Sequence, residues 1–176
     1  TPTTRSPNGI PSTPPTTAPH WPRGFSSGGV AAGIKKPGVN DLALLFGNGE
    51  FGDGELSAAA VFTRNLIVAA PIQVSRANLA VSSARIRALI INSGCANAAT
   101  GEEGLVRSRR TIESLAATLG IPSQSVLVNS TGVIGVQLPI DRIEKALPAL
   151  KASLQPGSCE TFARSIMTTD TRPKWA

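Results

Sequence analysis

A threonine–glycine pair, Thr131-Gly132, follows a short apolar run at 125–128 that is typical of a buried strand. A strand that opens into a turn at such a pair leaves backbone N–H groups without a partner in the sheet. Together with the Thr131 hydroxyl, those donors could stabilise the negative charge that forms on a carbonyl oxygen during acyl transfer. The same residue types are common in ordinary turns, so the pair by itself is compatible with both interpretations.

A second polar cluster, at 92–97, follows another apolar run of strand length at 88–92. The ends of strands in open α/β sheets often face ligands. Cys95 lies in this cluster, but the only histidine of the chain is His20, which would have to fold back to reach it. A small buried thiol is therefore favoured over a nucleophile, and Asn92 and Asn97 are expected to tie loops together.

Hydroxyl and charged side chains gather again at 168–174. Hydroxyls and cations together suit a ligand that carries a carboxylate, so this cluster could bind such a ligand. A polar loop of this composition also occurs without any ligand. None of the clusters contains an activated nucleophile, since Ser130 has no neighbouring base and no GxSxG motif.

Sites for metals and cofactors are not predicted. The two cysteines, Cys95 and Cys159, have no CxxC spacing, and one histidine adds too little for a zinc site. No GxxxxGK[ST] loop occurs, and the GxGxxG pattern at 47–52 opens no helix. The paucity of cysteines favours reduced thiols and a cytoplasmic location.

The composition of the 176 residues favours a globular protein, because 41% of them are hydrophobic. The net charge is +6, but lysines and arginines are scattered, so no nucleic-acid partner is expected. No apolar run approaches the roughly 20 residues that span a bilayer, so no membrane segment is expected. Residues 1–22 are rich in Pro and Thr and predict a flexible arm before a domain at 23–176. The arm lacks Asp and Glu, which leaves an organellar transit remnant open as an alternative location signal.

Strands and helices must position these clusters. Short apolar runs predict strands at 41–46, 56–63, 88–92 and 125–128. The first two are expected to pair as a hairpin across a glycine-rich turn. The run at 68–74 is compatible with extended chain or with a helix that starts at Pro71.

Apolar residues at helical spacing predict helices at 101–119, 140–150 and 159–167. Thr100 and Glu103 fit a capping box for the first helix, and Gly120 is placed to end it. Pro148 is expected to kink or split the second helix. Helices that alternate with strands favour a mixed α/β layered fold.

Six stretches of the chain resemble, in the same order, signatures of the ornithine acetyltransferases of arginine biosynthesis, also called glutamate N-acetyltransferases. The stretches are 29–35, 41–46, 60–65, 87–101, 130–135 and 166–174. The resemblance covers nearly the whole chain after the arm. It implies an αββα-type sandwich of the kind found in self-processing aminopeptidases, completed by a β chain.

The resemblance also implies a reaction. Members of this family are made as a precursor that cuts itself before a threonine, which gives an α chain and a β chain. The new N-terminal threonine of the β chain is the nucleophile, and its α-amino group can act as the base. The acetyl group passes from N-acetylornithine to this threonine and then to glutamate. Some members also accept acetyl-CoA as a substrate, and no other cofactor is implied.

On this resemblance the chain is an α chain, which would explain the missing nucleophile. Thr131 and Gly132 match the family's oxyanion-hole pair, and Thr168 matches its substrate-binding threonine. The αβ heterodimers are expected to pair further. No residue here matches the substrate-binding lysine of the family's Ala-Lys-Gly segment, and Lys174 is not a substitute for it.

Two alternatives stay open. The fold would also suit a self-processing amidohydrolase or aminopeptidase, which acyl transfer to glutamate would distinguish from plain hydrolysis. A non-catalytic module that binds a small amino acid is the other alternative. A second polypeptide that begins with threonine would exclude it.

Overall fold

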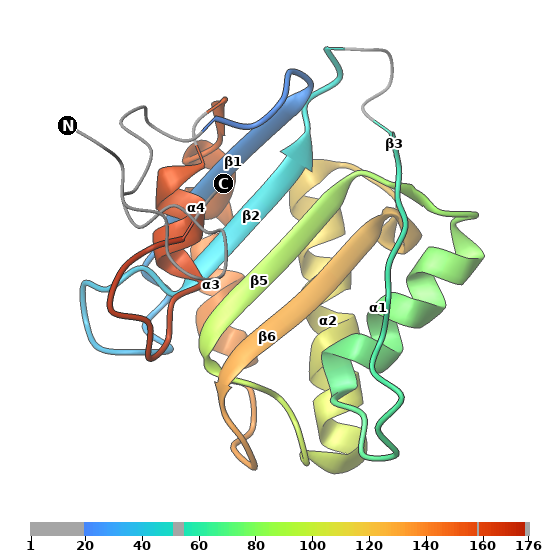
Figure 1. Ribbon diagram of the computed structural model, residues 1–176, viewed down its shortest axis with the longest axis vertical. Helices are drawn as coiled ribbons and strands as arrows, with labels where there is room; N and C mark the ends of the chain where they lie inside the picture. The colour runs from blue at the N-terminus through green and yellow to red at the C-terminus, as the bar shows by residue number, and fades with distance from the viewer. Residues whose placement is uncertain (1–19, 51–54, 158, 175–176) are drawn as a thin grey trace, which may run out of the picture.

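The computed structural model describes residues 20–50, 55–157 and 159–174, so the predicted arm at 1–22 lies almost entirely outside the described residues (Figure 1). Strands alternate with helices in it, as the apolar pattern predicted. In chain order the elements are β1 (Phe25–Val30), β2 (Leu42–Gly47), β3 (Leu56–Ser57), α1 (Ala70–Val81), β4 (Arg85–Ile86), β5 (Ala88–Cys95), α2 (Gly101–Leu119), the 3-10 turn η1 (Ser123–Ser125), β6 (Val126–Val133), α3 (Ile140–Ala152), β7 (Gln155–Pro156) and α4 (Glu160–Ser165).

Five strands form one mixed sheet in the order β6-β5-β2-β1-β7, and β3 pairs with β4 separately. Only β5 and β6 run parallel; the other neighbours in the large sheet are antiparallel. Because parallel strands end at the same edge, the cluster at 92–97 and the Thr131-Gly132 pair lie close together. The mixed α/β fold predicted from the sequence is confirmed.

The predicted hairpin between 41–46 and 56–63 is wrong. β2 lies between β1 and β5, while β3 keeps only two residues and pairs with β4. The partner that the sequence reasoning missed is β1, whose Gly28 and Gly29 weaken the strand pattern. Both glycines are needed for packing, because added Cβ atoms would lie 2.8 Å from Ser153 O and 3.1 Å from Ser165 Cβ, respectively.

Helices pack on both faces of the sheet. Neighbouring residues of a strand point to opposite faces, so the contacts of Gly28 and Gly29 place the ends of α3 and α4 on opposite sides. Figure 1 shows α2 and α3 together behind the sheet, where they enclose the main core. Its fully buried side chains include Leu42, Leu44, Leu115, Ile143, Leu147 and Leu150.

The helix α3 continues through Pro148, so the predicted split at this proline is wrong, while the predicted kink stays a prediction. A proline inside a helix costs about 3 kcal/mol. Leu147 and Leu150, on either side of it, are both buried in the core. Each such leucine contributes about 1.5–3 kcal/mol, enough to offset the proline.

The helix α1 covers the free edge of β6 and settles the alternatives left open for 68–74, since Pro71 lies in its first turn. The Ser75 hydroxyl donates to Val128 O (2.6 Å) and accepts the Val128 N–H (2.9 Å). Asn78 Nδ2 donates to Val126 O (2.8 Å). These side chains pair with backbone groups that an edge strand otherwise leaves open.

Of the two predictions for the ends of α2, the one for its N-terminus is wrong and the one for its C-terminus is confirmed. The predicted capping box is wrong, because Thr100 Oγ1 donates to Asn97 Oδ1 (2.8 Å) and caps no helix N–H. The Glu103 carboxylate pairs with Arg107 (2.7 Å). Gly120 ends the helix in the left-handed conformation, with φ of 72°, as predicted.

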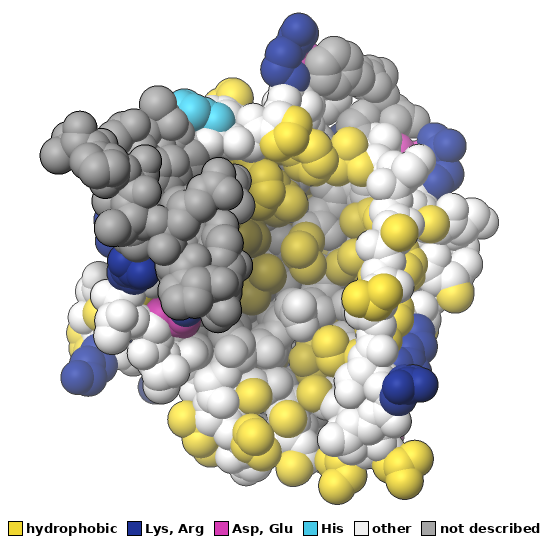
Figure 2. Space-filling model, viewed as in Figure 1, with side chains coloured by type: hydrophobic (Ala, Val, Ile, Leu, Met, Phe, Trp, Pro, Cys, Tyr) yellow, Lys and Arg dark blue, Asp and Glu magenta, His cyan; other side chains and the backbone are white. Residues whose placement is uncertain are grey.

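The sheet face opposite α2 and α3 stays partly open beyond α4. The register places Leu45, Leu89 and Leu127 side by side on this face, where all three are half-buried. Figure 2 shows hydrophobic side chains gathered in a hollow over this part of the sheet. Within the described ranges, none of the helices is both long and apolar enough to cross a membrane.

Candidate functional site

A cleft of about 980 Å³ lies at the carboxyl ends of β5 and β6. Four segments line it: the loop between β1 and β2, the end of β5, the end of β6, and the chain from α4 onward. The lining residues are Lys35, Lys36, Val39, Gly94, Thr131, Gly132, Val133, Arg164, Met167, Thr168, Thr169 and Asp170. The structure thus brings the three predicted site residues, Thr131, Gly132 and Thr168, to one cleft, while their roles stay predictions.

The turn predicted at Thr131-Gly132 is wrong, because β6 continues to Val133. Gly132 is registered against Gly94 of β5, and the pairing is irregular at Cys95. Two glycines allow this close approach: a Cβ on Gly132, where φ is +135°, would lie 2.7 Å from Gly94 Cα. Hydroxyl residues and glycine weaken the strand pattern, which explains why the sequence predicted a turn.

Thr131 faces the side of the sheet on which α4 packs. It is paired with Ser93, whose hydroxyl donates to Ser165 O (2.5 Å) at the end of α4. Thr131 is partly buried, and no residue that the structure describes hydrogen-bonds its hydroxyl. The hydroxyl is therefore available to a molecule in the cleft.

The asparagines of the 92–97 cluster tie loops together, as predicted. Asn92 Nδ2 donates to Cys95 O (2.8 Å), and its Oδ1 accepts the Ser130 hydroxyl (2.6 Å). Asn97 is fully buried, and its Nδ2 donates to Gly104 O (3.0 Å) at the start of α2. Since Ser130 donates to an amide oxygen, it has no base here that would activate it as a nucleophile.

Cys95 is a small buried thiol, which confirms the favoured interpretation. Its side chain is 3% exposed, and its Sγ donates to Val136 O (3.2 Å). Burial raises the pKa of the Cys95 thiol, so the thiolate is disfavoured at neutral pH. His20 lies beside Gly157, next to β7 at the far edge of the sheet, and so forms no pair with Cys95.

Thr168 belongs to the segment 167–170, which is held from two sides. The Thr168 N–H donates to Asp170 Oδ2 (3.4 Å), and the Lys35 ammonium donates to Met167 O (2.9 Å). Asp170 pairs with Lys174, and that hydrogen bond holds the pKa of Asp170 below its usual value. With Asp170 engaged by Lys174, the Lys35 ammonium contributes positive charge at this wall of the cleft.

A buried carboxylate shapes the loop between β1 and β2. Asp41 is fully buried and accepts the N–H groups of Ala32 (2.6 Å), Ile34 (2.6 Å) and Lys35 (2.8 Å). This arrangement fixes the backbone from which Lys35 reaches into the cleft. Sequence reasoning missed both Asp41 and Lys35, and the only signal was that both lie in stretches carrying the family resemblance.

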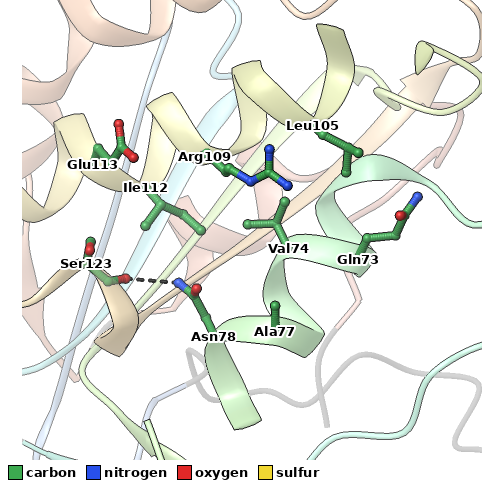
Figure 3. Close-up of a pocket in the computed structure, with 9 residues that line it drawn as sticks. All are labelled: Gln73, Val74, Ala77, Asn78, Leu105, Arg109, Ile112, Glu113 and Ser123. Atoms are coloured by element: carbon green, nitrogen blue, oxygen red, sulfur yellow. Dashed lines mark hydrogen bonds between the residues drawn. The ribbon is translucent and has the colours of Figure 1, made fainter. Parts of the chain in front are cut away.

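A second, smaller cavity of about 370 Å³ lies between α1, α2 and η1 (Figure 3). Its polar rim includes Asn78, which donates to Ser123 O (2.9 Å), and Arg109, which pairs with Glu102 (3.5 Å). None of the predicted site residues lines this cavity. The larger cleft is therefore the candidate site.

The chemistry of the cleft is that of hydroxyls, backbone groups and the Lys35 ammonium. Such groups bind anions and carbonyl oxygens. Within 20–50, 55–157 and 159–174, no group of three His, Cys, Asp or Glu side chains is arranged to hold a metal ion.

Comparison with known proteins gives a consistent match. The sequence profile of the ArgJ family matches residues 26–176. The arginine biosynthesis bifunctional protein ArgJ of Chlorobaculum tepidum is 45% identical over 161 residues, which cover 92% of this chain and 38% of that protein. Its counterpart in Nitratidesulfovibrio vulgaris is 45% identical over 155 residues, 88% of this chain. The chain spans 38% of the length of both relatives.

Two solved structures share the fold. Ornithine acetyltransferase from Mycobacterium tuberculosis, crystallised with ornithine, matches with a TM-score of 0.80 and 40% identity over 86% of this chain and 79% of that chain. The ArgJ protein from Bacillus halodurans matches with a TM-score of 0.75 and 36% identity over 85% of this chain and 75% of that chain. Fold and sequence therefore agree along the same stretch.

Proposed function

Because this chain belongs to the ArgJ family, we propose that it forms the α chain of an acetyltransferase in arginine biosynthesis. The reaction moves the acetyl group of N-acetylornithine to glutamate. The observation that carries the proposal is the cleft in which Thr131, Gly132 and Thr168 meet. The names of the relatives and the ornithine bound to the M. tuberculosis enzyme support the pathway and the substrate class.

The proposed mechanism has two acyl-transfer steps. A threonine hydroxyl attacks the acetyl carbonyl of N-acetylornithine, a C–O bond forms, the C–N bond breaks, and the amine leaves with a proton as ornithine. The glutamate amine then attacks the threonine ester, a C–N bond forms, the C–O ester bond breaks, and the threonine oxygen takes up the proton that the amine loses. In both steps Thr131 and the Gly132 N–H stabilise the tetrahedral oxyanion, and Thr168 binds the substrate.

We propose that the nucleophile is the N-terminal threonine of a β chain cut from the same precursor. Ser130, which sits next to the cleft residue Thr131, donates to Asn92 and has no base among the described residues. The half-buried leucines on the open sheet face suit a second layer supplied by that chain. The resulting αβ heterodimers would pair further.

A second acetyl donor is supported by the word bifunctional in the names of the curated relatives. We propose acetyl-CoA for this role, as a substrate and not as a resident cofactor. The cytoplasmic location stays a prediction.

The test uses the full-length protein that contains this chain. The protein is incubated with N-acetylornithine and glutamate, and ornithine, N-acetylglutamate and acetate are measured. Formation of N-acetylglutamate is expected, together with a second polypeptide that begins with threonine in the intact mass spectrum. Acetate without N-acetylglutamate would point to the amidohydrolase, and a single uncut, inactive chain would point to the binding module.

The role of Thr131 is tested by Thr131→Ala. Removing one oxyanion donor is expected to lower kcat about 100- to 1,000-fold and to leave the KM for N-acetylornithine nearly unchanged. Thr131→Ser keeps the hydroxyl and is the matched control. A Thr131→Ala enzyme with normal turnover would remove Thr131 from the oxyanion hole.

A further inference from the structure

We propose that Lys35 is a positioning residue that ties the Thr168 segment, residues 167–170, to the wall of the cleft formed by Gly94 and Gly132. This inference rests on the proposed function, because it assumes that Thr168 binds the substrate. Nothing in the sequence reasoning had assigned Lys35 a role.

The stem of Lys35 packs on the backbone at the end of β5. A Cβ added to Gly94 would lie 2.7 Å from Lys35 Cγ, so the lysine stem occupies the space that a side chain there would need. Gly94 is also in close contact with Gly132, because a Cβ added to Gly132 would lie 2.7 Å from Gly94 Cα. The backbone of the oxyanion pair and the lysine stem are thus packed in one contiguous stack.

The ammonium group of Lys35 contacts the other wall of the cleft, which the segment 167–170 forms. Its Nζ donates to Met167 O (2.9 Å), the carbonyl of the peptide that leads into Thr168. Burial lowers the pKa of Lys35, and the Asp41 carboxylate partly opposes this shift. A hydrogen bond from a charged, partly desolvated donor is stronger than one between neutral groups in water.

The backbone of Lys35 is held in place as well. The Lys35 N–H donates to Asp41 Oδ2 (2.8 Å), and Asp41 itself is fully buried at the start of β2. Because its backbone, its aliphatic chain and its ammonium group are all held, Lys35 can fix the Thr168 segment in place relative to the sheet.

The neighbouring lysine provides the contrast. Lys36 also lines the cleft, but its side chain is exposed and makes no hydrogen bond or ion pair with any residue in the described part of the chain; its backbone oxygen accepts the Val39 N–H (3.2 Å). An ordinary surface lysine behaves in this way. The structure therefore offers Lys36 as a matched control for a change at Lys35.

The experiment compares Lys35→Met, Lys35→Arg and Lys36→Met in the full-length protein. Lys35→Met keeps most of the stem and removes the donor. Loss of this hydrogen-bond donor should raise the KM for N-acetylornithine about tenfold or more, with kcat changed by less than about threefold. Lys36→Met should leave both constants near the wild-type values, and Lys35→Arg should restore part of the loss.

A second readout does not depend on activity. Hydrogen exchange of the 167–170 amides should become about tenfold faster in Lys35→Met and should stay unchanged in Lys36→Met. If the wild-type protein showed no acetyl transfer, the proposed function would be overturned. Hydrogen exchange of the 167–170 amides would then test the structural role of Lys35 by itself. Unchanged exchange at 167–170 in a folded Lys35→Met protein would overturn the inference, whatever the kinetics.

Discussion

Gly132→Ala places a methyl group where the backbones of β5 and β6 approach closely within the candidate site. The added Cβ would lie 2.6 Å from Cys95 N and 2.7 Å from Gly94 Cα. Both neighbours are backbone atoms, so neither can rotate away as a flexible side chain would. The substitution therefore has to move one strand relative to the other at the end of the parallel pair.

The expected cost has two parts. A residue with a side chain at φ of +135° stores about 1–3 kcal/mol of backbone strain. Overpacking against backbone adds about 1–3 kcal/mol. Gly135→Ala is the matched control, because Gly135 has φ of +80° and nothing within 4 Å of an added Cβ, so only the strain remains. The free energy of unfolding should thus fall by about 1–3 kcal/mol more in Gly132→Ala than in the control.

The assay is urea unfolding of the full-length variants, followed by acetyl transfer at saturating substrate. Displacing the Gly132 N–H from the proposed oxyanion hole should also lower kcat by about 100-fold or more, whereas Gly135→Ala should keep most of its turnover. Equal losses of stability in the two variants would refute the argument from close approach. Normal kcat in Gly132→Ala would refute the place of Gly132 in the oxyanion hole.

The remaining predictions concern three other side chains. Thr168→Ala should raise the KM for N-acetylornithine about 5- to 20-fold, because one hydrogen bond is lost, and Thr168→Ser should restore it; an unchanged KM in steady-state assays would count against the assignment. Asp41→Asn should lower the free energy of unfolding by about 3 kcal/mol in a urea titration, because three partly buried N–H groups lose a carboxylate acceptor, while the exposed Asp141→Asn should cost little. Ser75→Ala should cost about 1–3 kcal/mol in the same titration, because both backbone groups of Val128 lose their partner; a neutral result would mean that water replaces the hydroxyl.

Several elements could be predicted from local patterns because they depend on neighbours in the sequence. The apolar runs at 41–46 and 88–92 became β2 and the first part of β5, and Gly120 ended α2. Composition and alternation were enough for the mixed α/β fold. The hydroxyl and glycine clusters pointed to Thr131, Gly132 and the segment at 168–174, and the family resemblance singled out Thr168. None of these patterns indicated that the residues line one cleft.

Other features could not be predicted, because distant segments decide them. β1 contains two glycines and reads poorly as a strand, yet it is a strand because β2 and β7 pair with its two sides. The predicted turn at Thr131-Gly132 became strand because Gly94, far away in the sequence, leaves room for Gly132. The Pro148 helix persists because leucines on either side of the proline are buried.

By itself, the sequence determined the fold class and the types of group available for chemistry, since these follow from composition and local spacing. The family resemblance came from six stretches in the same order. Only the tertiary structure decided which groups share a cleft and what holds them there. The hydrogen bond from Lys35 to Met167 joins residues 132 positions apart. No local pattern encodes such a contact, because it exists only after the sheet has brought both segments to the same edge.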